Sequence, residues 1–209
     1  MKKIISFSSA IFILVLISTQ CFSQSIKKVK IGRQIWMAEN LNVDHFSNGD
    51  SILEAKTNEE WKQAGEKHQP AWCYYDNDTA NGKKYGKLYN WYAVNDPRGL
   101  APKGWHVPTD HEWTKLTNHL DGSGYKMKST SGWYAGQNGN NSSGFSGLPG
   151  GRRYDFGTFY NIGENGTRWS STEDQTTNAR SCDICWWLPY MSSNNSSKRI
   201  GFSVRCIKD

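Results

Sequence analysis

Apolar and polar residues follow three different patterns along the chain. Near the N-terminus the apolar run AIFILVLI begins at Ala10 and follows the basic residues Lys2 and Lys3. In the middle of the chain, apolar residues recur at the three- and four-residue spacing of amphipathic helices. From Gly124 onward, short apolar segments alternate with glycine, serine and asparagine, which is typical of strands joined by loops. The pattern predicts a targeting segment, a few helices and then mostly strands.

The targeting segment is predicted to be a secretory signal peptide covering residues 1–23. Its apolar core is too short to span a membrane as a mature helix, and Cys21 and Ser23 place small residues before a cleavage point at Gln24. The alternative is a lipoprotein signal with a lipid anchor on Cys21, although the preceding Gln20 is bulky for that peptidase. We therefore expect an exported protein of the periplasm, cell surface or medium, with membrane contact only through that lipid.

The remaining chain is expected to form one domain. Residues 24–30 are a short basic lead-in, and residues 31–209 are long enough for a single hydrophobic core. No internal repeat and no second unit is visible in the sequence.

A first helix is predicted after Thr57. This threonine and Glu60 have the spacing of a capping box, in which the two side chains satisfy backbone N–H groups at the helix start. The two to three turns that follow place Trp61 and Ala64 on one side.

A second capping box begins at Thr109 with Glu112. Apolar residues recur at i, i+3 and i+7 from Trp113, and Gly122 ends the helix. The same spacing in Leu88, Trp91 and Tyr92 predicts a third helix over residues 85–94.

Aromatic residues replace aliphatic ones as the main core material. All ten tryptophans and ten tyrosines follow residue 23, whereas leucine, isoleucine and valine are sparse. The residues with predicted structural roles in the core and at the second capping box are Trp91, Trp105, Thr109, Glu112 and Trp113.

The charge argues against a nucleic-acid partner. Without Lys2 and Lys3 the chain has 23 basic and 19 acidic residues, a net charge of +4, and its basic residues never form a run longer than two. Scattered charges of this kind are typical of a solvated surface rather than a nucleic-acid groove.

Seven motifs in fixed order resemble one known family. They are IWMAENLNV, WCYYDND, YGKLYNWYAV, GWHVPTDHEW, NSSGFSGLPGGRR, RWSSTE and GFSVRC. Together they resemble the Fibrobacter succinogenes major paralogous domain (FISUMP) family, found in exported proteins of Bacteroidetes and Fibrobacteres, over residues 30–209. The family has no established activity, so the resemblance implies that the protein is exported but does not imply which reaction, if any, it catalyses.

The order of motifs is also similar, more distantly, to the sulfatase-modifying-factor group of C-type-lectin-like folds. That resemblance implies an α+β architecture, with two main helices packed on short twisted antiparallel sheets and long loops. One position departs from the first family, which often carries cysteine where this chain has Ala101.

Four cysteines follow residue 23, and in an exported protein they are expected to form disulfides. They are Cys73, Cys182, Cys185 and Cys206, and three pairings are open. The spacing of Cys182 and Cys185 also matches a thioredoxin-type redox motif or half of a zinc site. The redox motif would have to lie at the start of a helix, and the zinc site would need two further ligands close by. The distant resemblance implies a further alternative, a copper-dependent oxidase of the formylglycine-generating type that uses both thiols.

No complete catalytic or metal constellation is visible. His45, His106 and His111 are candidate general bases, but His106 and His111 are five residues apart across a strand-to-helix turn, which does not suit a metal pair. The segment at Asp76 lacks the glycine and glutamate of a calcium loop. For the function that we favour, a non-catalytic binding or structural module, we predict no catalytic residue, no metal and no cofactor.

Aromatic loop residues are the strongest binding signal. Most are expected to lie in the core, with exposure around residues 152–156 and 186–190. The candidate ligand-binding residues are Arg152, Arg153, Tyr154, Asp155, Trp186, Trp187 and Tyr190. The sequence predicts a non-catalytic binding or structural module, whose partner is a surface glycan or an envelope protein.

Overall fold

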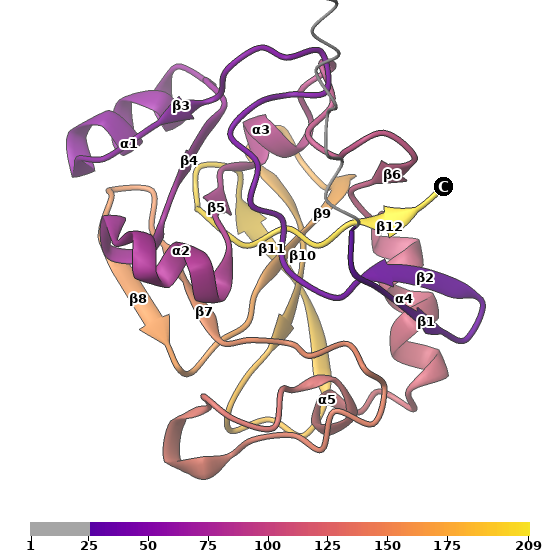
Figure 1. The fold of residues 1–209 in the computed structure, drawn as a ribbon. Coiled ribbons are helices and arrows are strands. Elements are labelled where there is room, and N and C mark those ends of the chain that lie inside the picture. Colours follow the sequence, from indigo (N-terminus) through magenta and orange to yellow (C-terminus); the bar gives the residue numbers. More distant parts are fainter. Residues whose placement is uncertain (1–25) are drawn as a thin grey trace, which may run out of the picture.

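A computed structural model describes residues 26–209, so the predicted signal peptide, the cleavage point at Gln24 and the lipid site at Cys21 lie outside the described residues. Helices and small sheets are mixed along the chain (Figure 1). The helices are α1 Asn58–Glu66, α2 Thr79–Tyr85, α3 Trp91–Val94, α4 Asp110–His119 and α5 Gly124–Met127, with 3₁₀ turns η1 Tyr75–Asn77 and η2 Tyr134–Gly136. Within the described residues, no helix has the length and apolar character needed to cross a membrane.

The strands are short and form four small sheets. In chain order they are β1 Lys28–Ile31, β2 Gln34–Met37, β3 Leu53–Glu54, β4 Ala71–Cys73, β5 Leu88–Tyr89, β6 Trp105–His106, β7 Gly150–Arg153, β8 Phe159–Ile162, β9 Arg168–Glu173, β10 Asn178–Ile184, β11 Met191–Ser197 and β12 Ile207–Lys208. The sheet orders are β1-β2-β12-β6, β11-β10-β9, β3-β4-β5 and β7-β8. All pairings are antiparallel except β3 with β4. The predicted α+β class is confirmed.

The last strand joins the first hairpin. Ile207 of β12 pairs with Trp36 of β2 on one side and with His106 of β6 on the other, and β12 lies beside β2 in Figure 1. The end of the chain therefore completes a sheet begun by its first described strands.

Both predicted capping boxes are present. Thr57 accepts from the amide of Glu60 at the start of α1, and Thr109 accepts from the amide of Glu112 at the start of α4. In each case the glutamate side chain accepts from the backbone of the capping threonine. Trp61, Ala64, Trp113, Leu116 and Leu120 are buried as their spacing predicted.

The predicted continuous helix over residues 85–94 is wrong for its first part, and beyond Tyr85 only α3, Trp91–Val94, is helical. α2 ends at Tyr85, because Gly86 adopts a φ of 77° and an added Cβ there would lie 2.8 Å from the carbonyl oxygen of Leu41. The chain then forms β5, which pairs with β4. Asn90 caps the single turn of α3 by accepting from the amide of Ala93. Leu88 and Trp91 are buried as expected, but on a strand and a single helical turn, and Tyr92 is only partly buried.

Aromatic side chains fill the core, as the composition predicted. Trp36, Trp61 and Trp169 are at most 1% exposed and lie in three separate clusters. Trp91 is also buried and donates to the carbonyl of Ser170. Trp105 is partly buried and pairs with β12.

Two arginines, Arg168 and Arg205, are buried in the same interior, and no carboxylate within residues 26–209 bonds either guanidinium. Both donate to the side-chain oxygen of Asn40 and to backbone carbonyls, and both stack over Phe145. Burial lowers the pKa of Arg168 to about 10, and burial followed by the nearby Arg168 charge lowers that of Arg205. The sequence alone did not predict these interior cations.

Candidate functional site

The loop between β10 and β11 is tied to α5 by a buried ammonium group. Lys128 is 4% exposed, and its Nζ lies 3.2 Å from the carbonyl oxygen of Trp186 and 3.4 Å from that of Leu188. It also lies 5.0 Å from the ring centroid of Trp133. Burial lowers the pKa of Lys128. The charge therefore contacts two loop carbonyls and a ring face, which fixes the loop backbone.

Backbone bonds hold the same loop at its other end. The amide of Gly124 donates to Pro189, and that of Met191 donates to Gly122. Ser123 and Tyr190 form an isolated antiparallel bridge. The loop conformation is thus fixed from both ends of α5, by Lys128 just after its last residue and by Ser123 and Gly124 at its start.

Aromatic rings on this anchored loop, on α5 and on η2 form a group that we call the aromatic surface; four of them are exposed, and Trp186 is partly buried against the core. Its members come from α5, η2 and the loop: Tyr125, Tyr134, Trp186, Trp187 and Tyr190. Trp187 and Tyr134 are each 57% exposed, Tyr190 is 53% exposed and Tyr125 is 52% exposed. Ring centroids lie 5.1 Å apart between Tyr134 and Trp186, and 6.3 Å apart between Trp186 and Trp187.

The rings of the aromatic surface do not form one flat plate. The interplanar angles are 69° between Tyr134 and Trp186 and 79° between Trp186 and Trp187. The ring faces and edges therefore point in several directions, which suits a ligand whose surface is uneven rather than flat. Sequence reasoning selected Trp186, Trp187 and Tyr190, but it missed Tyr125 and gave no reason to separate Tyr134 from the core aromatics.

The predicted residues 152–155 lie on β7 and the turn that follows it. Tyr154 stacks with Phe156, with centroids 5.5 Å apart, and meets Tyr160 edge-on at 5.1 Å. Phe156 and Tyr160 are exposed, whereas Tyr154 and Asp155 are intermediate. This is a second, smaller aromatic group.

Arg153, which was expected on an exposed segment, is fully buried. Its guanidinium donates to the carbonyls of Gly157, Ala55 and Thr57 at 2.6–2.8 Å. It also lies 5.0 Å from the ring centroid of Trp61. The prediction that placed Arg153 on a surface is wrong, since its guanidinium N–H groups bond to backbone carbonyls of the segment just before α1.

Arg152 also points inward for the most part. Its side chain is 20% exposed, one terminal nitrogen lies 3.9 Å from Asp183, and its charge lies 5.6 Å from the ring of Phe202. It therefore contributes little to an open surface beside the aromatic residues.

The four cysteines described by the structure are free and buried, which contradicts the predicted disulfides. Cys73 lies in the α1 cluster, Cys206 lies with Trp169, and Cys182 lies with Trp113. Burial raises the pKa of each of these three thiols to about 12. They act as small apolar side chains rather than as nucleophiles.

Cys182 and Cys185 cannot reach each other in this conformation. Three residues of extended chain span about 10 Å, whereas bridged cysteines have Cα atoms within about 7 Å. Positions three apart on a strand also face opposite sides. The Cys185 thiol instead donates to Asp183 at 2.9 Å, and burial together with that carboxylate raises its pKa. The arrangement gives no support to a redox pair or a two-thiolate copper site.

Of the candidate bases, His106 is bound on both sides. Its Nε2 lies 2.8 Å from Glu112 and its Nδ1 lies 2.7 Å from Asp209. Partial burial opposes protonation, but the two carboxylates outweigh it and raise the pKa of His106. His111 is exposed on α4. Among residues 26–209, no group of three histidine, cysteine or acidic side chains is arranged to hold a metal ion.

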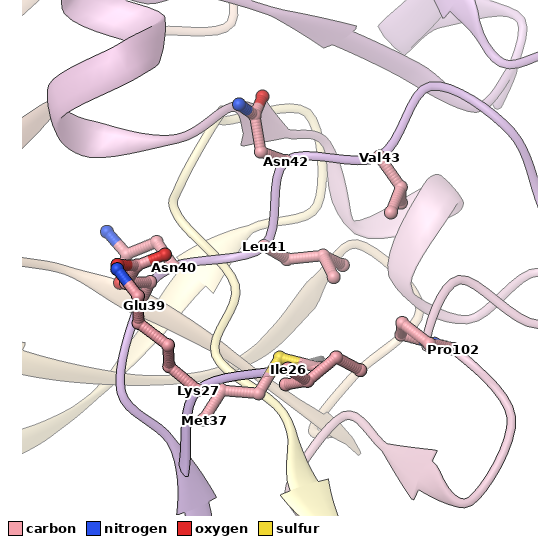
Figure 2. A pocket seen from close by; sticks show the side chains of 9 residues that line it. All are labelled: Ile26, Lys27, Met37, Glu39, Asn40, Leu41, Asn42, Val43 and Pro102. Carbon is pink, nitrogen blue, oxygen red and sulfur yellow. The ribbon is translucent and has the colours of Figure 1, made fainter. Parts of the chain in front are cut away.

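A surface hollow of about 420 Å³ lies between the first strands and the loop after α3. Figure 2 shows Leu41, Val43 and Pro102 around it, with the polar side chains of Lys27 and Glu39 at its other end. Those two form an ion pair at 2.8 Å. The hollow is therefore lined by apolar side chains, two asparagines (Asn40 and Asn42) and one neutralised pair, not by a set of converging catalytic groups.

Comparison with known proteins gives one match. The sequence model described as the Fibrobacter succinogenes major domain matches residues 29–208. No curated protein and no solved structure shows a significant match to the chain.

Proposed function

The chain belongs to the Fibrobacter succinogenes major domain family, and from this premise we propose that it is an exported, non-catalytic binding or structural module. Its ligand is a surface glycan or an envelope protein. The proposal includes cleavage of residues 1–23 and a destination in the periplasm, at the cell surface or in the medium. It also includes a C-type-lectin-like arrangement of the α+β fold, which the order of the sequence motifs supports.

The observation that carries the binding role is the anchored loop that exposes Trp187. Solvent-exposed tryptophan and tyrosine rings bring no benefit to folding, yet four rings on the aromatic surface are more than half exposed. The loop beneath them is rigidly held by Lys128. Rigid aromatic side chains lose little conformational entropy on binding, so they serve as contact residues for sugars and proteins.

Binding is tested with the secreted chain on a glycan array and against envelope proteins from the source cell. A bound ligand is then titrated by calorimetry against Trp187→Ala and Tyr134→Ala. We expect each substitution to weaken binding by roughly 10-fold or more, because hot-spot aromatic residues contribute about 2 kcal/mol or more. Phe156→Ala, in the second aromatic group, is the matched control and should leave binding unchanged.

Two results would contradict the proposal. One is that neither screen yields a ligand, and the other is that Trp187→Ala and Tyr134→Ala bind as tightly as the unchanged chain. Export is tested separately by cell fractionation and by the N-terminal sequence of the mature protein, which should begin at Gln24, or at a lipid-bearing Cys21 for the lipoprotein alternative.

A further inference from the structure

Asp44, His45 and Ser51 form a continuous hydrogen-bonded chain on the surface. Asp44 Oδ1 lies 2.6 Å from His45 Nδ1, and His45 Nε2 lies 3.1 Å from Ser51 Oγ. With its proton on Nδ1, the imidazole donates to the carboxylate and accepts from the hydroxyl. This is the order of contacts by which a carboxylate orients a histidine to take the proton from a serine nucleophile.

The backbone that carries these residues is held in place from below. The hydroxyl of Tyr89, which is fully buried, donates to the carbonyl of Val43 and accepts from its amide. Phe46 and Ile52 are buried, and the amide of Ile52 donates to the carbonyl of Asp44. His45 and Ser51 face each other as an isolated antiparallel bridge. The imidazole and the hydroxyl are therefore positioned by the core rather than by a mobile loop.

A buried cation lies behind the carboxylate. Lys87 is 3% exposed, and its Nζ lies 3.8 Å from Asp44 Oδ2 and 4.2 Å from the ring centroid of Trp72. The hydrogen bond with His45 and the charge of Lys87 hold the pKa of Asp44 below its usual range. Asp44 therefore stays ionised and keeps its hydrogen bond with His45 Nδ1.

The surroundings of this chain are open. The side chains of Asp44 and His45 are about half exposed, and Ser51 is exposed. Val43 lines the hollow of Figure 2, and Ser47 lines a second hollow with Pro102. The segment that carries Asp44 and His45 therefore borders two surface hollows, and its side chains are open to a bulky molecule.

We propose that Ser51 is an acyl-accepting nucleophile, with His45 as its base and Asp44 as a positioning residue, and that it hydrolyses unhindered esters displayed on larger molecules. Ser51 Oγ adds to the ester carbonyl as its proton passes to His45 Nε2. The tetrahedral intermediate expels the alkoxide, which takes that proton and leaves as the alcohol. Water then attacks the acyl-serine, its proton passes through His45, and the carboxylic acid leaves as Ser51 regains its hydrogen.

The test is labelling of the secreted chain with a fluorophosphonate probe, with peptide mapping by mass spectrometry and turnover of 4-nitrophenyl acetate in parallel. We expect the label on Ser51, its loss in Ser51→Ala, and a labelling rate about 100-fold lower in His45→Ala, because general-base assistance contributes 10²–10⁴-fold. Asp44→Asn should lower kcat and leave KM unchanged. Ser131→Ala is the matched control, since Ser131 is an exposed serine that lines neither of the two surface hollows.

Three outcomes would overturn the inference: no label on Ser51, equal labelling of His45→Ala and the unchanged chain, or ester turnover that survives Ser51→Ala. The three residues lie at the surface, so these substitutions are not expected to unfold the chain. The test does not involve the aromatic surface, so binding there is tested independently. Ester turnover by Ser51 would replace the non-catalytic part of the proposed function and leave its binding role in place.

Discussion

The buried ammonium of Lys128 donates to the carbonyl of Trp186, so a charge from the end of α5 holds the loop on which Trp187 is exposed. The rings that could contact a partner are therefore supported from inside the protein by a residue that the partner would not touch.

Replacement of Lys128 by methionine should release the loop without unfolding the domain. A buried charge exchanged for an apolar side chain of similar length is often neutral for stability, whereas the two bonds to Trp186 and Leu188 are lost. We expect faster hydrogen exchange in residues 186–190 and an unfolding midpoint within a few degrees of the original. Lys126→Met is the control, because that ammonium bonds the exposed Asp121. Unchanged exchange in the loop would show that Lys128 does not hold it.

Trp113→Ala should destabilise the protein by roughly 3–5 kcal/mol, the usual effect of truncating a buried tryptophan. Trp113 is 3% exposed, and its ring centroid lies 4.7 Å from that of Trp36. The measurement is urea unfolding followed by circular dichroism. His111→Ala, on the exposed side of α4, should change the free energy of unfolding by less than about 0.5 kcal/mol. A Trp113→Ala midpoint equal to that of the control would contradict the observed packing of α4.

The contact between His106 and Glu112 should make stability depend on pH. The pKa of His106 is raised above its ordinary 6.5, so its contribution is complete below that value and is lost as the pH rises through the folded-state pKa. The pKa of Glu112 is lowered from its ordinary 4.5 because its bonds to Thr109 and His106 outweigh burial. Its contribution is therefore present above 4.5 and is lost as the pH falls. Both contributions are complete at about pH 4.5–6.5.

This dependence is measured as the difference in unfolding free energy between the unchanged chain and His106→Gln across pH 4–9. We expect the difference to be largest between about pH 4.5 and 6.5 and to shrink on the alkaline side. A difference that grows with rising pH would contradict the sign of the His106 shift.

The free thiols should resist alkylation while the protein is folded. A thiol pKa raised from 9 to about 12 leaves roughly 1,000-fold less thiolate at neutral pH, and burial also blocks the reagent. In the chain that starts at Gln24, iodoacetamide should modify no cysteine under native conditions and all four after denaturation. Detection of a peptide that links Cys182 to Cys185 would mean that β10 is not extended there.

Local sequence was sufficient for the features that depend on a few neighbouring residues. Thr57 with Glu60 and Thr109 with Glu112 define two helix starts, because a capping box joins backbone and side chains only three positions apart. The frequent glycine, serine and asparagine after Gly124 indicated short strands and loops, which the structure has apart from the helical turns α5 and η2. The family was also recognisable from the order of its motifs.

The errors arose where distant contacts decided the outcome. Leu88 and Trp91 have helical spacing, but Gly86 must pass close to Leu41, and β5 pairs with β4. Arg153 follows Arg152 in a loop-like segment, yet its side chain is buried. It bonds to the carbonyls of Ala55 and Thr57, which lie almost a hundred residues earlier in the chain. Neither contact leaves a signal in the local pattern.

The sequence by itself determined the two capped helices, the aromatic character of the core and the family. Only the tertiary structure decided which aromatic rings face solvent, that the cysteines are separated, and that Ser51 meets His45. The physical reason is that helix starts and turns depend on neighbouring residues, whereas burial and hydrogen bonds between side chains depend on which distant segments come together. The aromatic surface illustrates both kinds of feature. Trp186 and Trp187 could be chosen as candidates from the sequence, but the role of Lys128 in holding their loop could not.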